Sequence, residues 1–290
     1  MRDAHGETWQ LRPGRVEDHA DFARLFGELG LEDPPPTLDM WVSGLMKHAY
    51  FVDGPEGPRA YALLDVMGDT GHVSSLVVAP GQRGLGVGRW VMGRLAELLR
   101  ARGCRQWRLY VKPDNAPAVA LYTSVGMKPG KLERTWCLSR GHMAALPPAP
   151  EALEVVPVVE SDFAPLTEAF GLVPGKLASY AAQPMHWLRR LADPTRPDAG
   201  WLGMMDLRPH PGLVFPFFAA TPAHARALLE AAFLEVASAR ELKLVTGDEA
   251  LQALLRAAGV RLVLETLEMR GPLPEEPAAK TPGRSAPGRR

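Results

Sequence analysis

Residues 78–89 read Val-Ala-Pro-Gly-Gln-Arg-Gly-Leu-Gly-Val-Gly-Arg and contain four glycines. An apolar run at 73–78 predicts a strand before it, and apolar residues spaced as on a helix follow it from Trp90 to Leu99. A helix start exposes unpaired N–H groups and the positive end of the helix dipole. Because the glycines of this stretch let that backbone approach a bulky anion, the turn predicts a phosphate or pyrophosphate site.

Two common nucleotide-binding patterns do not fit this turn. A P-loop ends in Gly-Lys-Ser/Thr, whereas the turn continues as Gly88-Arg89-Trp90. A dinucleotide fingerprint has the spacing G-x-G-x-x-G after the first strand of a βαβ unit, whereas this turn has G-x-G-x-G after about the fourth predicted strand. Taken alone, the turn is also compatible with a plain tight loop.

The turn resembles the Arg/Gln-x-x-Gly-x-Gly/Ala fingerprint of the Gcn5-related N-acetyltransferase (GNAT) superfamily, as Arg83-x-x-Gly86-x-Gly88. Val-x-Pro precedes it at 78–80, as in that family. The family's Asn-x-x-Ala-x-x-Leu-Tyr-x-x-x-Gly pattern follows at 115–126, with Met127 in place of the usual Phe. The opening Leu-Arg-Pro at 11–13 resembles the family's first strand, so that the resemblance spans residues 9–139.

The resemblance implies acetyl-CoA as co-substrate and a gap between the fourth and fifth strands that holds the pantetheine arm. By analogy, the strand backbone pairs with the pantetheine amides, the turn backbone holds the pyrophosphate, and Asn115 hydrogen-bonds the arm. Tyr122 is expected near the sulfur, as proton donor to the leaving thiolate. The residues expected to bind the co-substrate are Leu76, Val77, Val78, Arg83, Gly84, Leu85, Gly86, Val87, Gly88, Arg89, Asn115 and Tyr122. An ordinary helix cap for Asn115, packing on the sheet for Tyr122 and a solvated position for Arg83 remain open.

The general base is less clearly marked in the sequence. His72 opens the fourth predicted strand and is the candidate base or water relay, and Asp65 at the end of the third strand is another. Enzymes similar to this one often use a chain of waters instead of a single base. Glu32 and Asp33 lie in the loop where relatives shape the acceptor site; they either attract a cationic amine or form a solvated loop.

The second half of the sequence repeats the first. We expect a strand at 153–158, two helices of which one contains Trp187, two strands, a long helix at 223–239, and a strand, helix and strand to 269. Residues 221–228 stand where the glycine turn should be and contain no glycine. Asp248 and Leu255 replace the Asn and the Tyr of the family pattern. The second copy is therefore expected to be degenerate and to bind no acetyl-CoA of its own.

The predicted fold class is α/β (α+β), with two tandem GNAT-like domains that each have a mixed, mostly antiparallel sheet flanked by helices. Residues 1–145 form the acetyltransferase domain, 151–271 form the degenerate domain, and 272–290 form a disordered tail. Two fused copies can imitate the dimer of single-copy relatives, so that we expect a monomer or a weak dimer.

Composition excludes several classes of protein. Basic and acidic residues both total 33, without the basic excess that is typical of nucleic-acid binders. The chain has two cysteines, Cys104 and Cys137, far apart in sequence, so that neither a disulfide framework nor a metal site is expected. No apolar run is long enough to span a membrane and no signal peptide is recognised, which predicts a cytoplasmic protein.

The predicted function is acetyl transfer from acetyl-CoA to a primary amine, by direct attack of the amine on the thioester. A small-molecule amine is expected as acceptor because a second domain can enclose the cleft. Two alternatives remain: a protein or peptide N-acetyltransferase, which needs an open groove, and a non-catalytic regulatory module that binds acetyl-CoA.

Overall fold

The computed structural model describes residues 9–54, 57–209, 211–236 and 240–275. The first half consists of β1 (Leu11–Pro13), α1 (His19–Phe26), α2 (Leu38–Met40), β2 (Ala49–Val52), β3 (Ala60–Met67), β4 (Thr70–Val78), α3 (Val87–Ala101), β5 (Gln106–Val111), α4 (Ala116–Ser124) and β6 (Lys128–Ser139). The second half consists of β7 (Glu154–Pro157), α5 (Phe163–Phe170), α6 (Lys176–Ala181), β8 (Trp187–Ala192), β9 (Gly203–Arg208), β10 (Leu213–Ala219), α7 (Pro222–Glu235), β11 (Glu241–Thr246), α8 (Glu249–Ala257) and β12 (Arg261–Pro272). The same order of strands and helices occurs twice, which confirms the predicted α/β fold class and the repeat.

One element of the second half was assigned to the wrong type. Trp187, expected in a helix, begins strand β8, in which Leu188 lies opposite Asp206 and Arg189 opposite Met205 of β9. The two buried side chains of β8, Leu188 and Leu191, lie three residues apart, a spacing that also fits a helix, so that the pairing with β7 and β9 identifies the strand. The second helix lies earlier, at α6.

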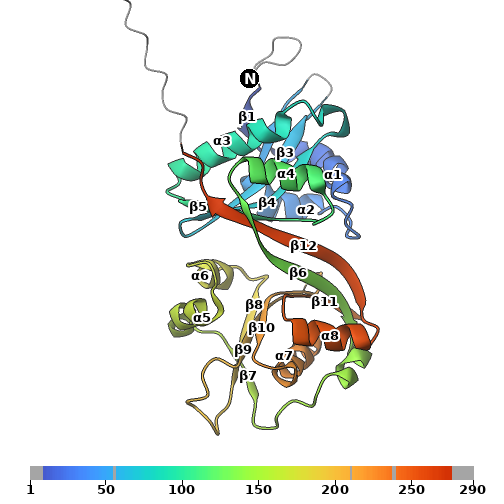
Figure 1. The fold of residues 1–290 in the computed structure, drawn as a ribbon, viewed down its shortest axis with the longest axis vertical. Coiled ribbons are helices and arrows are strands. Elements are labelled where there is room, and N and C mark those ends of the chain that lie inside the picture. The colour runs from blue at the N-terminus through green and yellow to red at the C-terminus, as the bar shows by residue number, and fades with distance from the viewer. Residues whose placement is uncertain (1–8, 55–56, 210, 237–239, 276–290) are drawn as a thin grey trace, which may run out of the picture.

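The two halves exchange their last strands (Figure 1). The described strands form one sheet in the order β1-β2-β3-β4-β5-β12-β6-β11-β10-β9-β8-β7. Strand β12 of the second half pairs with β5 of the first, from Leu267 opposite Val111 to Pro272 opposite Gln106. Strand β6 of the first half pairs with β11 of the second, and β6 and β12 also pair with each other. The two expected sheets are therefore continuous, a feature that the sequence analysis did not predict.

Helices cover both faces of the sheet in each half. In the first half, α3 and α4 pack on one face around Leu95 and Trp107, and α1 packs on the other around Phe22. In the second half, α7 and α8 cover one face and α5 and α6 the other. The strand exchange continues in the cores, because Met269 of β12 is buried in the first half and Trp136 of β6 in the second. Neither half completes its core without the other.

The start of the predicted disordered tail is ordered. Pro272 ends β12, the N–H of Leu273 donates to the Arg105 carbonyl, and Arg100 donates to the Pro274 carbonyl at 3.0 Å. Disorder therefore does not begin at 272, because the last strand needs these residues to complete its pairing with β5. The rest of the predicted tail, 276–290, lies outside the described residues.

Candidate functional site

Strands β4 and β5 run together at one end and separate at the other. They pair in parallel only from Thr70 opposite Gln106 to Val73 opposite Leu109. Ser74 is an extra residue in β4, because the register with β3 shifts between Leu64–Val73 and Leu63–Ser75. Beyond this bulge, the edge of β4 at residues 76–78 faces a gap instead of β5. This is the open edge that the resemblance predicts for the pantetheine arm.

The glycine turn lies at the end of this open edge. Gly84 and Gly86 have φ values of +76° and +84°, in the left-handed region that side chains disfavour, and Gly86 caps the start of α3. Gly88 packs closely, since a Cβ there would lie 3.0 Å from Leu121 of α4. Val87 is buried in the core, and the Leu85 side chain is exposed, so these two residues can offer only backbone groups to an anion.

Arg83 lies across the end of β4 and does not cover the turn. Its Nε donates to the Val78 carbonyl at 3.1 Å, and its guanidinium pairs with Glu28 at 2.8 Å. The Val78 carbonyl is one of the groups that a ligand amide would use on the open edge. A ligand that pairs there must displace the Arg83 side chain. Arg89, by contrast, is exposed on the first turn of α3.

Asn115 and Tyr122 both lie on α4, which packs beside the start of α3. Asn115 is the N-cap of α4, and its side-chain oxygen accepts a hydrogen bond from the Ala118 N–H at 3.2 Å. Tyr122 is buried in the same core as Val87, and burial raises the pKa of Tyr122 to about 12. Its hydroxyl therefore keeps its proton at neutral pH and can act as a donor.

His72 lies on the opposite face of the sheet from Tyr122. Its ring meets Tyr110 edge-on at 6.0 Å, whereas its neighbour Val73 points into the core that holds Tyr122. Burial, followed by the charge of Arg108, lowers the pKa of His72 to about 4, so that the imidazole is neutral at neutral pH. The two catalytic candidates are thus separated by the sheet, and any joint role requires the gap between β4 and β5.

Asp65, on the neighbouring strand β3, lies opposite His72. Burial acts to raise the pKa of Asp65, but a hydrogen bond from His48 at 2.9 Å and the charges nearby lower it overall. Ser74, at the bulge, lies 3.4 Å from the same carboxylate. Asp65 is therefore a charged partner of two histidines and a poor proton acceptor.

The junction of the halves adds polar residues that the sequence analysis missed. Arg108 donates to the Tyr110 hydroxyl at 2.6 Å, and Phe215 of β10 meets the Tyr110 ring at 6.3 Å. Lys176 of α6 lies over the Phe215 ring, 4.7 Å from its centroid, and burial, followed by Arg108, lowers the pKa of Lys176 to about 8. Burial also raises the pKa of the Glu133 carboxyl. Alternation along β5 points to Arg108 and Tyr110, but no local pattern brings second-half residues beside them.

A groove of about 610 Å³ opens along this junction. Its lining includes the 30–33 loop, Tyr110, Lys112, Glu133, Phe215 and residues 262–266. Glu32 pairs with Arg261 at 2.9 Å, and Asp33 pairs with Lys243. Both acidic residues of the loop are therefore engaged with the second half, which neither reading from the sequence anticipated.

The described residues hold few other features with a chemical role. Among them, no group of three or more His, Cys, Asp or Glu side chains lies close enough to hold a metal ion. Cys104 and Cys137 are both free and buried. Within the same ranges, no helix has the length and apolar character needed to cross a bilayer. Among the described residues, the gap, the turn and the groove are the features that bear on the predicted acetyl transfer.

Residues 17–127 match the family model described as the acetyltransferase (GNAT) family. Over 60 residues the chain is 45% identical to the mycothiol acetyltransferase of Beutenbergia cavernae, a match that covers 21% of this chain and 20% of that protein. Over 88 residues it is 31% identical to the ribosomal protein bS18-alanine N-acetyltransferase of Salmonella typhimurium, which covers 30% of this chain and 60% of that protein. The chain thus matches less than two thirds of the length of each of these curated relatives.

A solved structure shares nearly the whole fold. A tandem GNAT protein from the clavulanic acid biosynthesis pathway superposes with a TM-score of 0.61, at 14% identity, over 91% of this chain and 98% of that one. At this identity the likeness concerns the fold, and it includes both halves. Residues 17–127, which include the glycine turn and α4, thus carry a domain of the GNAT acetyltransferase family, and the two halves share the fold of a tandem GNAT protein.

Proposed function

We propose that this protein is an acetyl-CoA-dependent N-acetyltransferase that acts on the primary amine of a small molecule. The observation that carries the proposal is the open edge of β4, which ends at a helix start built from glycines in the left-handed conformation. An extended arm with amides fits the edge, and a pyrophosphate fits the helix start. The residues proposed to bind acetyl-CoA remain those of the open edge, the turn and α4.

The residues of the first half can supply the parts that the reaction needs. The N–H groups of the β4 edge near Val78 would donate to the thioester oxygen, where negative charge develops as the amine attacks. Tyr122, which is protonated at neutral pH, would donate its proton to the leaving thiolate. His72 has too low a pKa to hold the amine proton, so that its proposed role is to orient a water that carries this proton away.

The groove between the halves supports a small acceptor. Its volume of about 610 Å³ lies within the usual range for small-molecule sites, and the second half forms part of its wall. The Salmonella relative is named for acetylation of a protein's alanine, which gives the second candidate, a protein N-terminus. A peptide must leave the site through an open end of the groove, whereas a small amine need not.

Calorimetry with acetyl-CoA tests the co-substrate site. The wild type should bind one acetyl-CoA per chain, and Gly86→Glu should abolish binding, because Gly86 has φ +84° and a glutamate would bring a side chain and a negative charge to the proposed pyrophosphate site. Gly81→Ala is the matched control: it lies in the same stretch, has ordinary φ and has open space around it. Binding that survives Gly86→Glu would refute the proposed turn, and two sites per chain would show that the second half also binds the co-substrate.

Turnover tests the acceptor. Release of the free thiol of coenzyme A is followed with small primary amines and, in parallel, with short peptides that carry a free N-terminus. Small amines should be turned over with higher kcat/KM. Faster turnover of peptides would favour the second candidate, and acetyl-CoA binding without turnover of either class would favour a regulatory module.

A further inference from the structure

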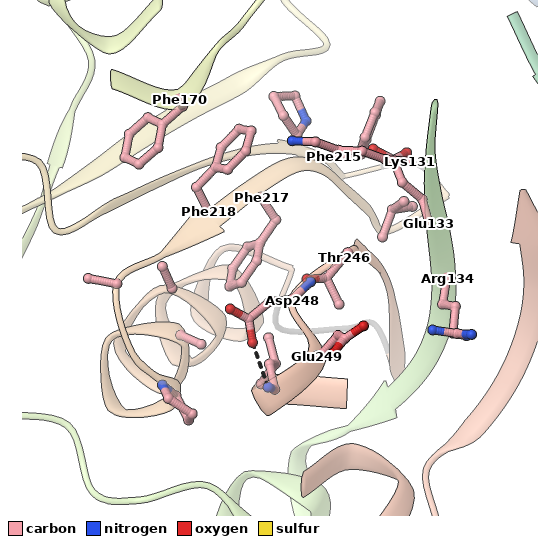
Figure 2. Close-up of a pocket in the computed structure, with 18 of the residues that line it drawn as sticks. Lys131, Glu133, Arg134, Phe170, Phe215, Phe217, Phe218, Thr246, Asp248 and Glu249 are labelled. Carbon is pink, nitrogen blue, oxygen red and sulfur yellow. Dashed lines mark hydrogen bonds between the residues drawn. The ribbon is translucent and has the colours of Figure 1, made fainter. Parts of the chain in front are cut away.

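The second half has a cavity of its own, of about 680 Å³ (Figure 2). It is bounded by β10, β11, β6 and the end of α5. Four phenylalanines line it: Phe170, Phe215, Phe217 and Phe218. Two adjacent carboxylates, Asp248 and Glu249, lie at the start of α8 in the same lining. This cavity is separate from the gap proposed for acetyl-CoA.

The backbone holds this cavity open in the same way as the gap of the first half. Strands β10 and β11 pair in parallel only at Leu213–Lys243 and Val214–Leu244. The register of β10 with β9 then shifts between Val214 and Phe217, which corresponds to the bulge at Ser74 of β4. The repeat has thus kept the opening between its strands, although it has lost the glycines.

The entrance to this cavity does not suit a pyrophosphate. Helix α7 starts at Pro222, which has no N–H, and the Thr221 hydroxyl already accepts a hydrogen bond from the His224 N–H. Side chains stand where the first half has glycines. The carboxylates of Asp248 and Glu249 add two negative charges, which outweigh the roughly half positive charge of one helix start. A nucleotide cofactor would therefore meet side chains and a missing N–H group at the start of α7, and negative charge at the start of α8.

The carboxylate of Asp248 is only partly used by the protein. One oxygen accepts from the Leu251 N–H at 2.6 Å, which caps α8, and the residue is exposed. Figure 2 shows Asp248 beside the cavity together with Phe217 and Thr246. The lining has two basic residues: Arg134 is paired with Glu265 at 2.6 Å, and Lys131 lies near Phe215, away from Asp248 (Figure 2). The α8 end of the cavity is therefore acidic, and its walls are aromatic.

We propose that this cavity is a binding site for a small organic cation, namely a primary ammonium with an aromatic or aliphatic body. The ammonium lies on Asp248, and the body packs on Phe217, which lies beside Asp248 in Figure 2. Phenylalanine faces attract cations as well as apolar groups. The protein already has such a cation–π contact at one lining residue, since the Lys176 ammonium lies 4.7 Å from the centre of the Phe215 ring.

Calorimetry with the phenethylammonium ion tests the site on the full chain. The wild type should bind the probe, and Asp248→Asn should weaken binding at least about tenfold, because it removes a charge-assisted hydrogen bond. Asparagine caps a helix as well as aspartate does, so that α8 is kept. The neutral 2-phenylethanol and the anionic 3-phenylpropionate, which share the ring, should bind more weakly than the ammonium.

Two further variants locate the binding. Phe217→Leu keeps most of the apolar volume but removes the ring face beside Asp248, and it should weaken binding of the probe. Asp33→Asn, in the groove between the halves, should leave affinity for the probe within about twofold. No binding, equal binding of 3-phenylpropionate, or wild-type affinity in Asp248→Asn would each overturn the proposal. A further test uses the Gly86→Glu protein. If it binds acetyl-CoA, and binds it more tightly when Asp248→Asn is added, the cavity holds the cofactor and the proposal is overturned.

Discussion

His72 shows how burial can change the chemistry of a single residue. Its sequence position makes it a candidate base, but burial and Arg108, with further contributions from Lys176 and Arg208, lower its pKa to about 4. Asp65 opposes this shift and is outweighed. A histidine with such a pKa is neutral through the physiological pH range and does not become protonated to imidazolium there. The surroundings, and not the residue type, decide its role.

The same shift predicts a pH-dependent stability. The pKa of His72 is about 6.5 in the unfolded chain and about 4 in the folded chain. Because the folded pKa is lowered, the unfolded state takes up the proton first, and stability falls as the pH drops from about 6.5 towards 4. His72→Gln should flatten this part of the curve. Urea unfolding at pH 7 and pH 5 measures it, and parallel losses in both proteins would contradict the assigned pKa.

Among the helices and strands, the sequence predicts features that depend on nearby residues and does not predict the pairing of distant strands. The turn, α3 and α4 have motifs with fixed spacing, and Gly86 and Asn115 have the conformations that these motifs need. Strands β6 and β12 carry the same kind of signal as any other strand, since periodicity marks a strand and does not mark its partner. Their exchange depends on contacts more than 100 residues apart, such as Arg134 with Glu265.

Strand β12 should stabilise the first half although it belongs to the second. Met269 is fully buried against the first-half core, so that Met269→Ala should lower the free energy of unfolding by about 2–4 kcal/mol. Leu262→Ala on the same strand is the control; its side chain is 42% exposed, and the loss should stay below about 1 kcal/mol. Urea unfolding followed by tryptophan fluorescence compares them. Equal losses in the two variants would show that burial of Met269 in the first-half core contributes little to the free energy of unfolding.

At the scale of the whole molecule, the second half reaches into the proposed acceptor groove. Phe215 and Lys176 come from elements far from the first-half motifs, and no sequence pattern connects them with Tyr110. The loop at 30–33 is held from the other side by ion pairs with β11 and β12. The sequence could therefore predict the proposed co-substrate site, whose residues lie within one half, far better than the groove, which both halves build.

The ion pair between Asp33 and Lys243 should position this loop and thereby affect the amine more than acetyl-CoA. Both side chains are partly exposed, so that breaking the pair should cost less than about 1 kcal/mol of stability. Asp33→Lys and Lys243→Glu should each raise the amine KM about threefold or more, with acetyl-CoA affinity unchanged. The double variant, with wild-type net charge and a reversed pair, should restore KM.

Steady-state kinetics on the three proteins separates loop position from simple attraction of a cation. Groove charge alone predicts opposite effects of the two single variants, because one adds positive charge and the other adds negative charge. Loop position predicts the same effect from both and rescue in the double variant. Arg94→Ala, which breaks an exposed pair with Glu97 on α3, is the control and should leave KM unchanged. Opposite shifts in KM, or a double variant as impaired as the singles, would mean that the second half encloses the groove without positioning its loop.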